Sequence, residues 1–224
     1  MKLSNHTTSV LKNFATINQN LVIKEGNTIT TMSAMKNIVA KADVEETFPQ
    51  EVAIYDLNEF LESLSLFTNP ILDFAENHVM IREENNSSNS LKYFYSDPSV
   101  VTSPSKTITM PSQEVTFTMS NEDLSKLKKA AGVIGAPDMV LEKNGSGSSL
   151  TVKDKKNDTA NNYSLSVDTN GEGEFNFFFK VENMKLLDGT YDVEISSKNI
   201  SHYTNKSSAI EYWIALEPES TYTV

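Results

Sequence analysis

The same order of helix and strand patterns runs twice along the 224-residue chain, and this repeat restricts the possible folds more than any other feature. Residues 4–17 predict an amphipathic helix, because apolar side chains recur there at alternating steps of four and three. Strand patterns follow up to Tyr55, a second helix pattern begins at Asp56, and three strand patterns with a polar loop at 83–90 complete the first half. The chain is therefore predicted to be an α+β protein with two structurally repeated domains, each with two helices on antiparallel sheets.

A proline-containing stretch separates the two halves. It carries Pro98, Pro104 and Pro111 among serines and threonines, with only scattered apolar residues. Since a residue that precedes proline avoids the helical region, this stretch predicts an extended linker. The predicted N-terminal domain, interdomain linker and C-terminal domain are residues 1–96, 97–113 and 114–224.

The second half opens with a helix-capping pattern. Ser120 can cap a helix whose first turn is acidic, as the helix dipole favours. Gly132 and Gly135 are expected to end that helix. Four strand patterns come next, followed by a short helix expected at 181–187 and three final strands. The second half thus repeats the order of the first.

The charge of the chain restricts its partners. A net charge of -11 ordinarily argues against nucleic-acid binding, because a negative surface repels phosphate. However, there is no acidic residue between Met1 and Gln19, so the predicted first helix is not negative although the whole chain is. Arg82 is the sole arginine among nineteen basic residues, so the bidentate fork that reads guanine is nearly absent. Any DNA contact is therefore expected to be loose and independent of base sequence.

Both halves open with a helix that carries lysines opposite or beside its apolar stripe. For either helix considered alone, lysines that only increase solubility explain the pattern equally well. The recurrence at the same place in both halves favours a shared basic surface. The lysines concerned are Lys2 and Lys12 in the first half and Lys126, Lys128 and Lys129 in the second.

Patterns of catalysis and metal binding are missing from the sequence. There is no cysteine, and the three histidines are far apart, without a second histidine at metal-ligand spacing. Gly145-Ser146-Gly147 lacks the lysine and helix of a phosphate-binding loop and is interpreted as a hairpin turn. We therefore expect no catalytic residue, metal or cofactor, and a protein that is not an enzyme. No apolar stretch is long enough to span a bilayer, so a membrane partner is not expected.

Five runs of sequence, at helix starts, at the linker and near the C-terminal end, carry a family resemblance. They are Leu11–Asn18, Val52–Asn58, Asp97–Val101, Asn183–Lys185 and Ala215–Glu217. In these runs the chain closely resembles the DNA polymerase sliding clamp of T-even-type bacteriophages. The resemblance extends from the first residue to the last, and the middle of each half is the most diverged. It identifies the chain as a diverged relative of that clamp.

The resemblance implies a DNA-clamp fold and a processivity function. A homotrimer of two-domain subunits would form a closed ring that slides on duplex DNA and tethers the replicative DNA polymerase. An ATP-dependent clamp loader would place the ring on DNA. A second role would be coactivation of late transcription, with a sigma-like factor and RNA polymerase, in the cytoplasm of the infected bacterial host. The competing hypothesis is a β-rich phage structural or adhesion protein.

The resemblance also implies two sets of site residues. By position, DNA contact is expected at Lys2, Lys12, Lys126, Lys128, Lys129 and Lys185. A groove for a partner peptide is expected beside the linker, although ordinary packing explains its residues equally well. Its candidate walls are Val100, Val101, Ile108, Met110, Leu216 and Pro218. The second helix departs from a basic lining, because it carries Glu59 and Glu62.

Overall fold

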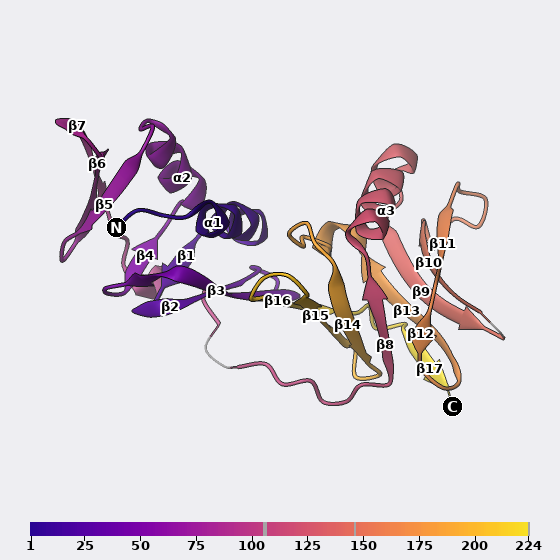
Figure 1. Cartoon of the computed structure of the whole chain (residues 1–224). Coiled ribbons are helices and arrows are strands. Elements are labelled where there is room, and N and C mark those ends of the chain that lie inside the picture. Colours follow the sequence, from indigo (N-terminus) through magenta and orange to yellow (C-terminus); the bar gives the residue numbers. More distant parts are fainter. Residues whose placement is uncertain (105–106, 146, 224) are drawn as a thin grey trace. The chain divides into compact units, whose positions relative to one another are not determined.

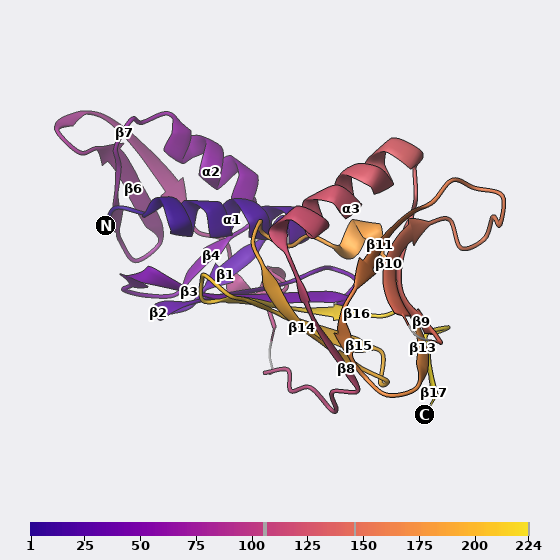
Figure 2. The same ribbon diagram turned by 45° about the vertical axis from the view of Figure 1, so that its right-hand side comes forward.

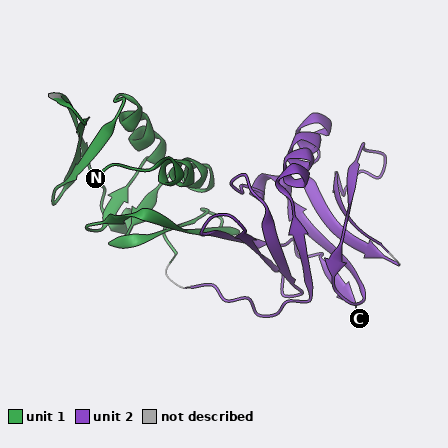
Figure 3. Ribbon diagram, in the orientation of Figure 1, with its two compact units in different colours: residues 1–106 green, residues 107–224 purple. Residues whose placement is uncertain are grey.

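The computed structural model describes residues 1–104, 107–145 and 147–223 and divides the chain into two compact units. Unit 1 comprises residues 1–106 and unit 2 residues 107–224 (Figure 3). Residues 105–106 of the predicted linker and Ser146 of the predicted hairpin turn lie outside the described residues. Each unit combines α-helix with antiparallel sheet, so the α+β class is confirmed.

Unit 1 has the predicted order of helix, four strands, helix and three strands. The strands β3, β2, β1 and β4 are neighbours in one sheet, and β5, β6 and β7 form a second sheet, all antiparallel. The elements are α1 (Asn5–Ile17), β1 (Leu21–Ile23), β2 (Gly26–Met32), β3 (Ile38–Phe48), β4 (Val52–Ile54), α2 (Leu57–Ser65), β5 (Pro70–Phe74), β6 (His78–Glu83), β7 (Asn86–Phe94) and the 3-10 turn η1 (Pro98–Val100).

Helix α1 lies along one face of the sheet formed by β3, β2, β1 and β4 (Figures 1 and 2). Ser4 caps it, because its side chain accepts a hydrogen bond from the Thr7 backbone N–H at 3.1 Å. The apolar stripe is buried against the sheet, and Phe14 is among the largest fully buried side chains. Since an apolar side chain contributes roughly 1.5–3 kcal/mol when it is buried, this stripe fixes which face of α1 remains polar.

Helix α2 begins directly after strand β4, where the sequence places its start. Asp56 is its N-cap, and the carboxylate accepts hydrogen bonds from the backbone N–H groups of Asn58 and Glu59. The ring of Phe60 packs edge-on against Tyr93 of β7, with 5.2 Å between centroids. The Tyr93 hydroxyl in turn donates to the Asp56 carbonyl oxygen at 3.1 Å. These contacts hold α2 against the last strand of the second sheet.

The polar loop predicted at 83–90 is wrong. Strand β6 runs to Glu83 and β7 starts at Asn86, so a two-residue turn joins them. The residues of the first part of β7 are polar because this strand lies at the sheet edge, and Ser88, Asn89 and Ser90 are exposed. Backbone pairing with β6, rather than burial, therefore keeps this segment extended.

Unit 2 also has two antiparallel sheets. Their strand orders are β12-β8-β14-β15-β16 and β11-β10-β9-β13-β17. The strands β8, β12 and β17 are absent from the sequence prediction. The elements are β8 (Val115–Met119), α3 (Asn121–Ile134), β9 (Asp138–Asn144), β10 (Gly147–Lys153), β11 (Tyr163–Val167), β12 (Thr169–Asn170), β13 (Glu174–Lys180), the 3-10 turn η2 (Val181–Asn183), β14 (Tyr191–Ser196), β15 (Ile200–Asn205), β16 (Ile210–Ala215) and β17 (Thr221–Thr223).

Helix α3 packs against β10 and β11 (Figure 1). Ser120 caps it as predicted, because its hydroxyl accepts from the Asp123 backbone N–H at 3.0 Å. Gly135, with a φ of 66°, is the left-handed C-cap. The prediction that Gly132 also ends the helix is wrong, since this residue lies within α3.

The helix predicted at 181–187 is also wrong, because only the turn η2 forms there. Side chains from other elements satisfy the backbone that follows. Lys128 Nζ donates to the Leu186 carbonyl oxygen at 2.9 Å, and the Leu187 backbone N–H donates to the Tyr212 hydroxyl at 3.1 Å. These partners stabilise an irregular segment in place of helical hydrogen bonds.

Candidate nucleic-acid interface

The polar face of α1 is a stripe of exposed residues one helical turn apart. Asn5, Ser9, Lys12 and Thr16 are exposed, whereas the opposite side of the helix is buried. No acidic residue occurs in α1, and within the described part of the chain Lys12 has no ion pair. The charge of Lys12 is therefore not neutralised by a carboxylate of its own helix.

Lys2 lies just before α1 and is partly engaged. Its Nζ atom is 2.8 Å from Glu84 Oε2, and the two side chains are 50% and 40% exposed. An exposed pair of this kind contributes little to stability, so a phosphate can compete for the ammonium group. Lys2 thus remains a candidate for DNA contact, with a carboxylate beside it.

The lysines of α3 differ from one another. Lys129 is exposed, and within the described residues it has no ion pair. Lys126 is exposed as well, but its Nζ atom is 2.6 Å from Glu122 Oε1, one turn earlier on the same helix. The hydrogen bond and charge of Glu122 raise the pKa of Lys126. The unpaired positive charge of α3 therefore lies at Lys129.

Lys128, which the sequence places beside the apolar stripe of α3, is engaged within unit 2. Lys12 and Lys128 occupy equivalent positions relative to the N-cap serines of α1 and α3, yet Lys12 is exposed and Lys128 is half-buried. The Lys128 ammonium donates to the Leu186 carbonyl oxygen, and burial lowers its pKa. Lys128 therefore fastens α3 to the segment after η2, and its ammonium group is already engaged within unit 2. Lys185, in that same segment, is half-buried and also has a polar partner.

Helix α2 is acidic on its surface. Glu59 and Glu62 are both exposed. Burial and the nearby charges of Glu59 and Asp56 raise the pKa of the Tyr93 hydroxyl to about 12. Of the two helices of unit 1, α1 therefore carries a basic surface and α2 an acidic one.

The first part of the linker has two adjacent valines in different environments. Val101 is 8% exposed and packs with Val22 and Ala53, so it belongs to the core of unit 1. Val100, at the end of η1, is 60% exposed. Of these two candidate groove residues, only Val100 presents apolar surface.

The remaining candidate groove residues lie in unit 2. Ile108 and Met110 are half-buried, and Pro218 is exposed. Leu216 is 5% exposed, and its backbone N–H donates to the Asn199 carbonyl oxygen at 3.0 Å. Leu216 is therefore a packing residue, whereas Pro218 and the two linker residues retain accessible surface.

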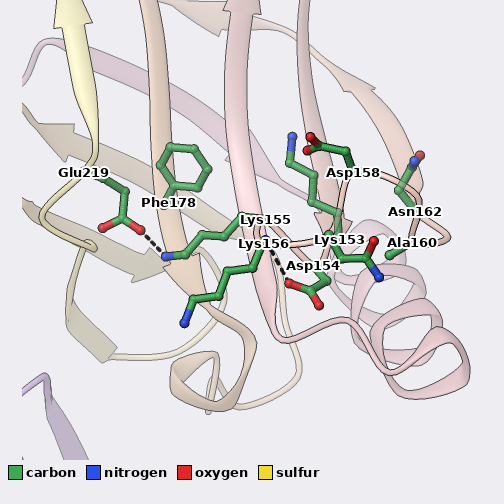
Figure 4. A pocket seen from close by; sticks show the side chains of 10 residues that line it. Lys153, Asp154, Lys155, Lys156, Asp158, Ala160, Asn162, Phe178 and Glu219 are labelled. Atoms are coloured by element: carbon green, nitrogen blue, oxygen red, sulfur yellow. Dashed lines mark hydrogen bonds and ion pairs between the residues drawn. The ribbon is translucent and has the colours of Figure 1, made fainter.

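The structure adds a cavity in unit 2 that the sequence did not predict (Figure 4). Its volume is about 510 Å³, and the loop between β10 and β11 meets β13 and the chain before β17 there. The Lys155 ammonium forms ion pairs with Glu219 and, at 3.3 Å, with Glu217, and lies 5.5 Å from the centroid of the Phe178 ring. The lining residues are Lys153, Asp154, Lys155, Lys156, Asn157, Asp158, Ala160, Asn162, Phe178 and Glu219. The lysine-rich run 153–156 and the phenylalanine run 177–179 were the available sequence signals.

Two further structural findings concern the described residues. Residues 1–104, 107–145 and 147–223 contain no group of three or more His, Cys, Asp or Glu side chains that could hold a metal ion. Within the same ranges, no helix is both long and apolar enough to cross a bilayer.

Comparison with known families and relatives gives consistent matches along the chain. Residues 2–101 match the family model of the DNA polymerase processivity factor, and residues 116–218 match the model described as gp45 sliding clamp, C terminal. The sliding clamp of Vibrio phage KVP40 is 34% identical over 223 residues, which cover 97% of this chain and 99% of the relative. The sliding clamp of Enterobacteria phage T4 is 31% identical, with 99% of both chains covered.

Solved structures of low sequence identity share the fold. The proliferating cellular nuclear antigen of Entamoeba histolytica superposes with a TM-score of 0.69 at 15% identity and covers 94% of each chain. A PCNA2-PCNA3 complex from Sulfolobus tokodaii gives a TM-score of 0.67 at 13% identity, covering 95% of this chain and 96% of that one. The DNA-clamp fold expected from the sequence is thereby confirmed.

Proposed function

The chain belongs to the sliding-clamp family of DNA polymerase processivity factors, and from this premise we propose that it encircles duplex DNA as a homotrimeric ring. As a member of this family it is a processivity factor and not an enzyme. Family membership also removes the competing hypothesis of a phage structural or adhesion protein. The proposal concerns the ring, the DNA it surrounds and the partners that use it.

One observation carries the DNA proposal. In a chain with a net charge of -11, α1 and α3 each present an exposed lysine that has no ion pair within the described residues. These are Lys12 and Lys129. Because the two helices open the two halves of the chain, a ring of three copies would carry six such lysines. Lys2 adds to this surface beside α1, and Lys126 and Lys185 are weaker candidates because each already has a polar partner.

Enclosure explains why so few lysines are sufficient. A closed ring stays on DNA because it cannot fall off, so the attraction to phosphate need only be weak and screened by salt. Lysine suits this role, since it is a point charge without the rigid bidentate fork of arginine. The acidic remainder of the chain repels DNA outside the ring, which makes the channel the favourable place for the duplex.

Sheet edges support ring closure. Strand β7 ends one sheet of unit 1, and β11 ends one sheet of unit 2. Each therefore has backbone groups that a strand from another copy can pair with. Pairing of β7 in one copy with β11 in the next is a head-to-tail contact, and such contacts close into a ring when the rotation permits it.

The proposed partners follow from the family premise. An ATP-dependent clamp loader opens and places the ring, and the replicative DNA polymerase docks a peptide on accessible apolar residues. Val100 in unit 1 is one candidate, and Ile108, Met110 and Pro218 in unit 2 are separate candidates. The cavity in unit 2 adds the aromatic surface of Phe178, close to the chain around Glu219 that follows Pro218. A sigma-like factor with RNA polymerase would use the same clamp for late transcription, in the cytoplasm of the infected bacterial host.

The first experiment concerns the ring itself. Sedimentation velocity and negative-stain imaging of the purified chain are expected to show a trimer with a central hole. The loaded clamp is expected to remain on circular primed DNA at high salt and to slide off linear DNA with free ends. Compact monomers without a hole, at concentrations well above micromolar, would refute the proposal.

A second experiment compares two pairs of lysines of equal charge. Lys12→Glu with Lys129→Glu is expected to reduce the stimulation of the polymerase by the loaded clamp about tenfold, because both changes lie on the proposed channel surface. The matched control is Lys24→Glu with Lys156→Glu, which also changes one exposed lysine in each unit. Equal losses from both pairs would show that net charge alone matters. Lys155 is unsuitable as a control, because it is ion-paired with Glu217 and Glu219.

A further inference from the structure

The acidic surface of α2 has no place in a basic DNA channel, and its position in unit 1 indicates another role. Helix α2 rests on the edge strand β7 through the Phe60–Tyr93 ring contact and the Tyr93–Asp56 hydrogen bond. Glu59 directly precedes Phe60, which contacts Tyr93, and Glu59 and Glu62 are both exposed. After burial, the charge of Glu59 also contributes to the raised pKa of Tyr93. An acidic helix side therefore borders a free sheet edge.

Unit 2 has the opposite charge at its own free edge. Helix α3 packs against the edge strand β11, where Tyr163 is half-buried. Lys126 is exposed on α3, the helix that contacts β11. After Glu122, Tyr163 of β11 also contributes to the raised pKa of Lys126. A basic helix side therefore borders this second edge.

Each of these helices also ends in an exposed apolar side chain. Leu66, the C-cap of α2, is 71% exposed, and Val133, in the last turn of α3, is 78% exposed. Single exposed apolar side chains are common on protein surfaces, so Leu66 and Val133 support an interface through their matching positions and not through their exposure alone. The helix beside each edge thus ends in an apolar residue and has one charged side, which is acidic on α2 and basic on α3.

We propose that the acidic side of α2 in one copy, Glu59 and Glu62, pairs with the Lys126 side of α3 in the next copy. This pairing rests on the proposed ring and assigns the three residues to the junction between copies rather than to DNA. When β7 of one copy and β11 of the next continue one sheet across the junction, the sheet face covered by α2 and the sheet face covered by α3 lie on the same side of that sheet. Helices α2 and α3 then become neighbours.

The charges also select the orientation of the contact. A symmetric dimer through two β7 edges would bring two acidic α2 sides together, and one through two β11 edges would bring two Lys126 sides together. Like charges placed face to face disfavour both arrangements. The head-to-tail contact is the one in which opposite charges meet, and it is also the contact that allows ring closure. The Glu122–Lys126 pair does not prevent this, because it is exposed and Glu122 is 75% accessible.

The test is a charge swap measured by sedimentation velocity over a concentration series at low ionic strength. Glu59→Lys with Glu62→Lys, and separately Lys126→Glu, are each expected to weaken association about tenfold per junction. All three changes in one chain place opposite charges together again, so association should return to within about threefold of the original. Lys129→Glu alters the same helix by the same charge and is expected to leave association unchanged.

The outcomes separate this inference from the proposed function. If the unaltered chain forms no ring, the proposed function fails. If the ring forms and both single-helix reversals assemble as the unaltered chain does, or if the combined chain is no better than either reversal, this inference alone is overturned. If a charge reversal disturbs folding, as judged by circular dichroism, neutral variants replace it. Glu59→Gln with Glu62→Gln, and separately Lys126→Gln, are each expected to weaken association about threefold.

Discussion

The Nζ atom of Lys128 donates a hydrogen bond to the carbonyl oxygen of Leu186 at 2.9 Å. The bond joins α3 to the irregular segment after η2, and Leu186 itself is buried. A part-buried carbonyl that loses its donor is destabilising, because the desolvation of the carbonyl oxygen is then no longer compensated. Lys128 therefore stabilises unit 2, whereas its neighbour Lys129 faces solvent.

Replacing Lys128 by methionine should lower the free energy of unfolding by about 1–2 kcal/mol, since the apolar stem is retained and only the donor is lost. The measurement is urea unfolding followed by circular dichroism. Lys129→Met, one residue further along the helix, should change the stability by less than about 0.5 kcal/mol. Equal stability of the two variants would contradict a structural role for Lys128.

Glu46 of β3 supplies the acid that the first turn of α1 lacks. Partial burial opposes its ionisation, but hydrogen bonds from the Thr7 hydroxyl and the Ser4 backbone N–H hold its pKa below the ordinary value. A carboxylate with a lowered folded-state pKa stabilises the fold above its unfolded pKa of about 4.3. That contribution is lost as the pH falls through the lower folded-state value.

Glu46→Gln should therefore reduce stability by about 1 kcal/mol near neutral pH and less in acid. Thermal unfolding between roughly pH 7 and 3 tests this, and the curves of the variant and the original chain should converge at the acidic end. Glu45→Gln, at the exposed neighbouring position of β3, is the matched control. A constant difference across the pH range would show that the Glu46 charge is not involved.

Two glycines at the end of α3 should respond to alanine in opposite directions. Gly132 lies inside the helix, and an added Cβ would meet no atom within 4 Å, so Gly132→Ala should stabilise the protein by about 0.5–1 kcal/mol. Gly135 has a φ of 66°, where an L side chain is strained, so Gly135→Ala should destabilise it by about 1 kcal/mol. Melting temperatures measured in parallel give both signs. The same sign for both changes would be inconsistent with Gly135 as the C-cap.

Substitutions at the two adjacent valines of the linker should have different effects, one on stability and the other on partner binding. Val101→Ala should cost roughly 1–2 kcal/mol of stability, because the side chain packs with Val22 and Ala53. Val100→Ser should leave stability nearly unchanged and reduce the stimulation of the polymerase by the loaded clamp. Chemical denaturation measures the first effect, and primer extension measures the second. Normal primer extension with Val100→Ser would exclude this residue from the docking surface.

Local signals were sufficient for much of the fold. Ser4, Asp56 and Ser120 are hydrogen-bond acceptors placed directly before amphipathic patterns, and each one caps a helix in the structure. Apolar periodicity likewise identified the buried sides of α1 and α3. These features depend on residues within one or two turns, so the amino-acid sequence expresses them without reference to the rest of the chain.

The errors arise where distant residues supply the stabilisation. Strand β8 alternates Val115, Phe117 and Met119, but no strand is predicted in this short segment between the proline-containing stretch and the helix cap Ser120. The polar first part of β7 is extended because β6 pairs with it. The segment 181–187 is not helical because side chains from α3 and β16 satisfy its backbone. Propensity cannot anticipate partners that are far apart in sequence.

Local sequence patterns were enough to predict the α+β repeat, the helix starts and the lysines on both opening helices. Which of these lysines are available depends on the packing of the folded units. Lys12 and Lys129 remain exposed, Lys126 pairs with Glu122, and Lys128 turns to the Leu186 carbonyl oxygen. The physical reason is that helical periodicity sets the direction of a side chain, whereas burial and long-range hydrogen bonding set its environment.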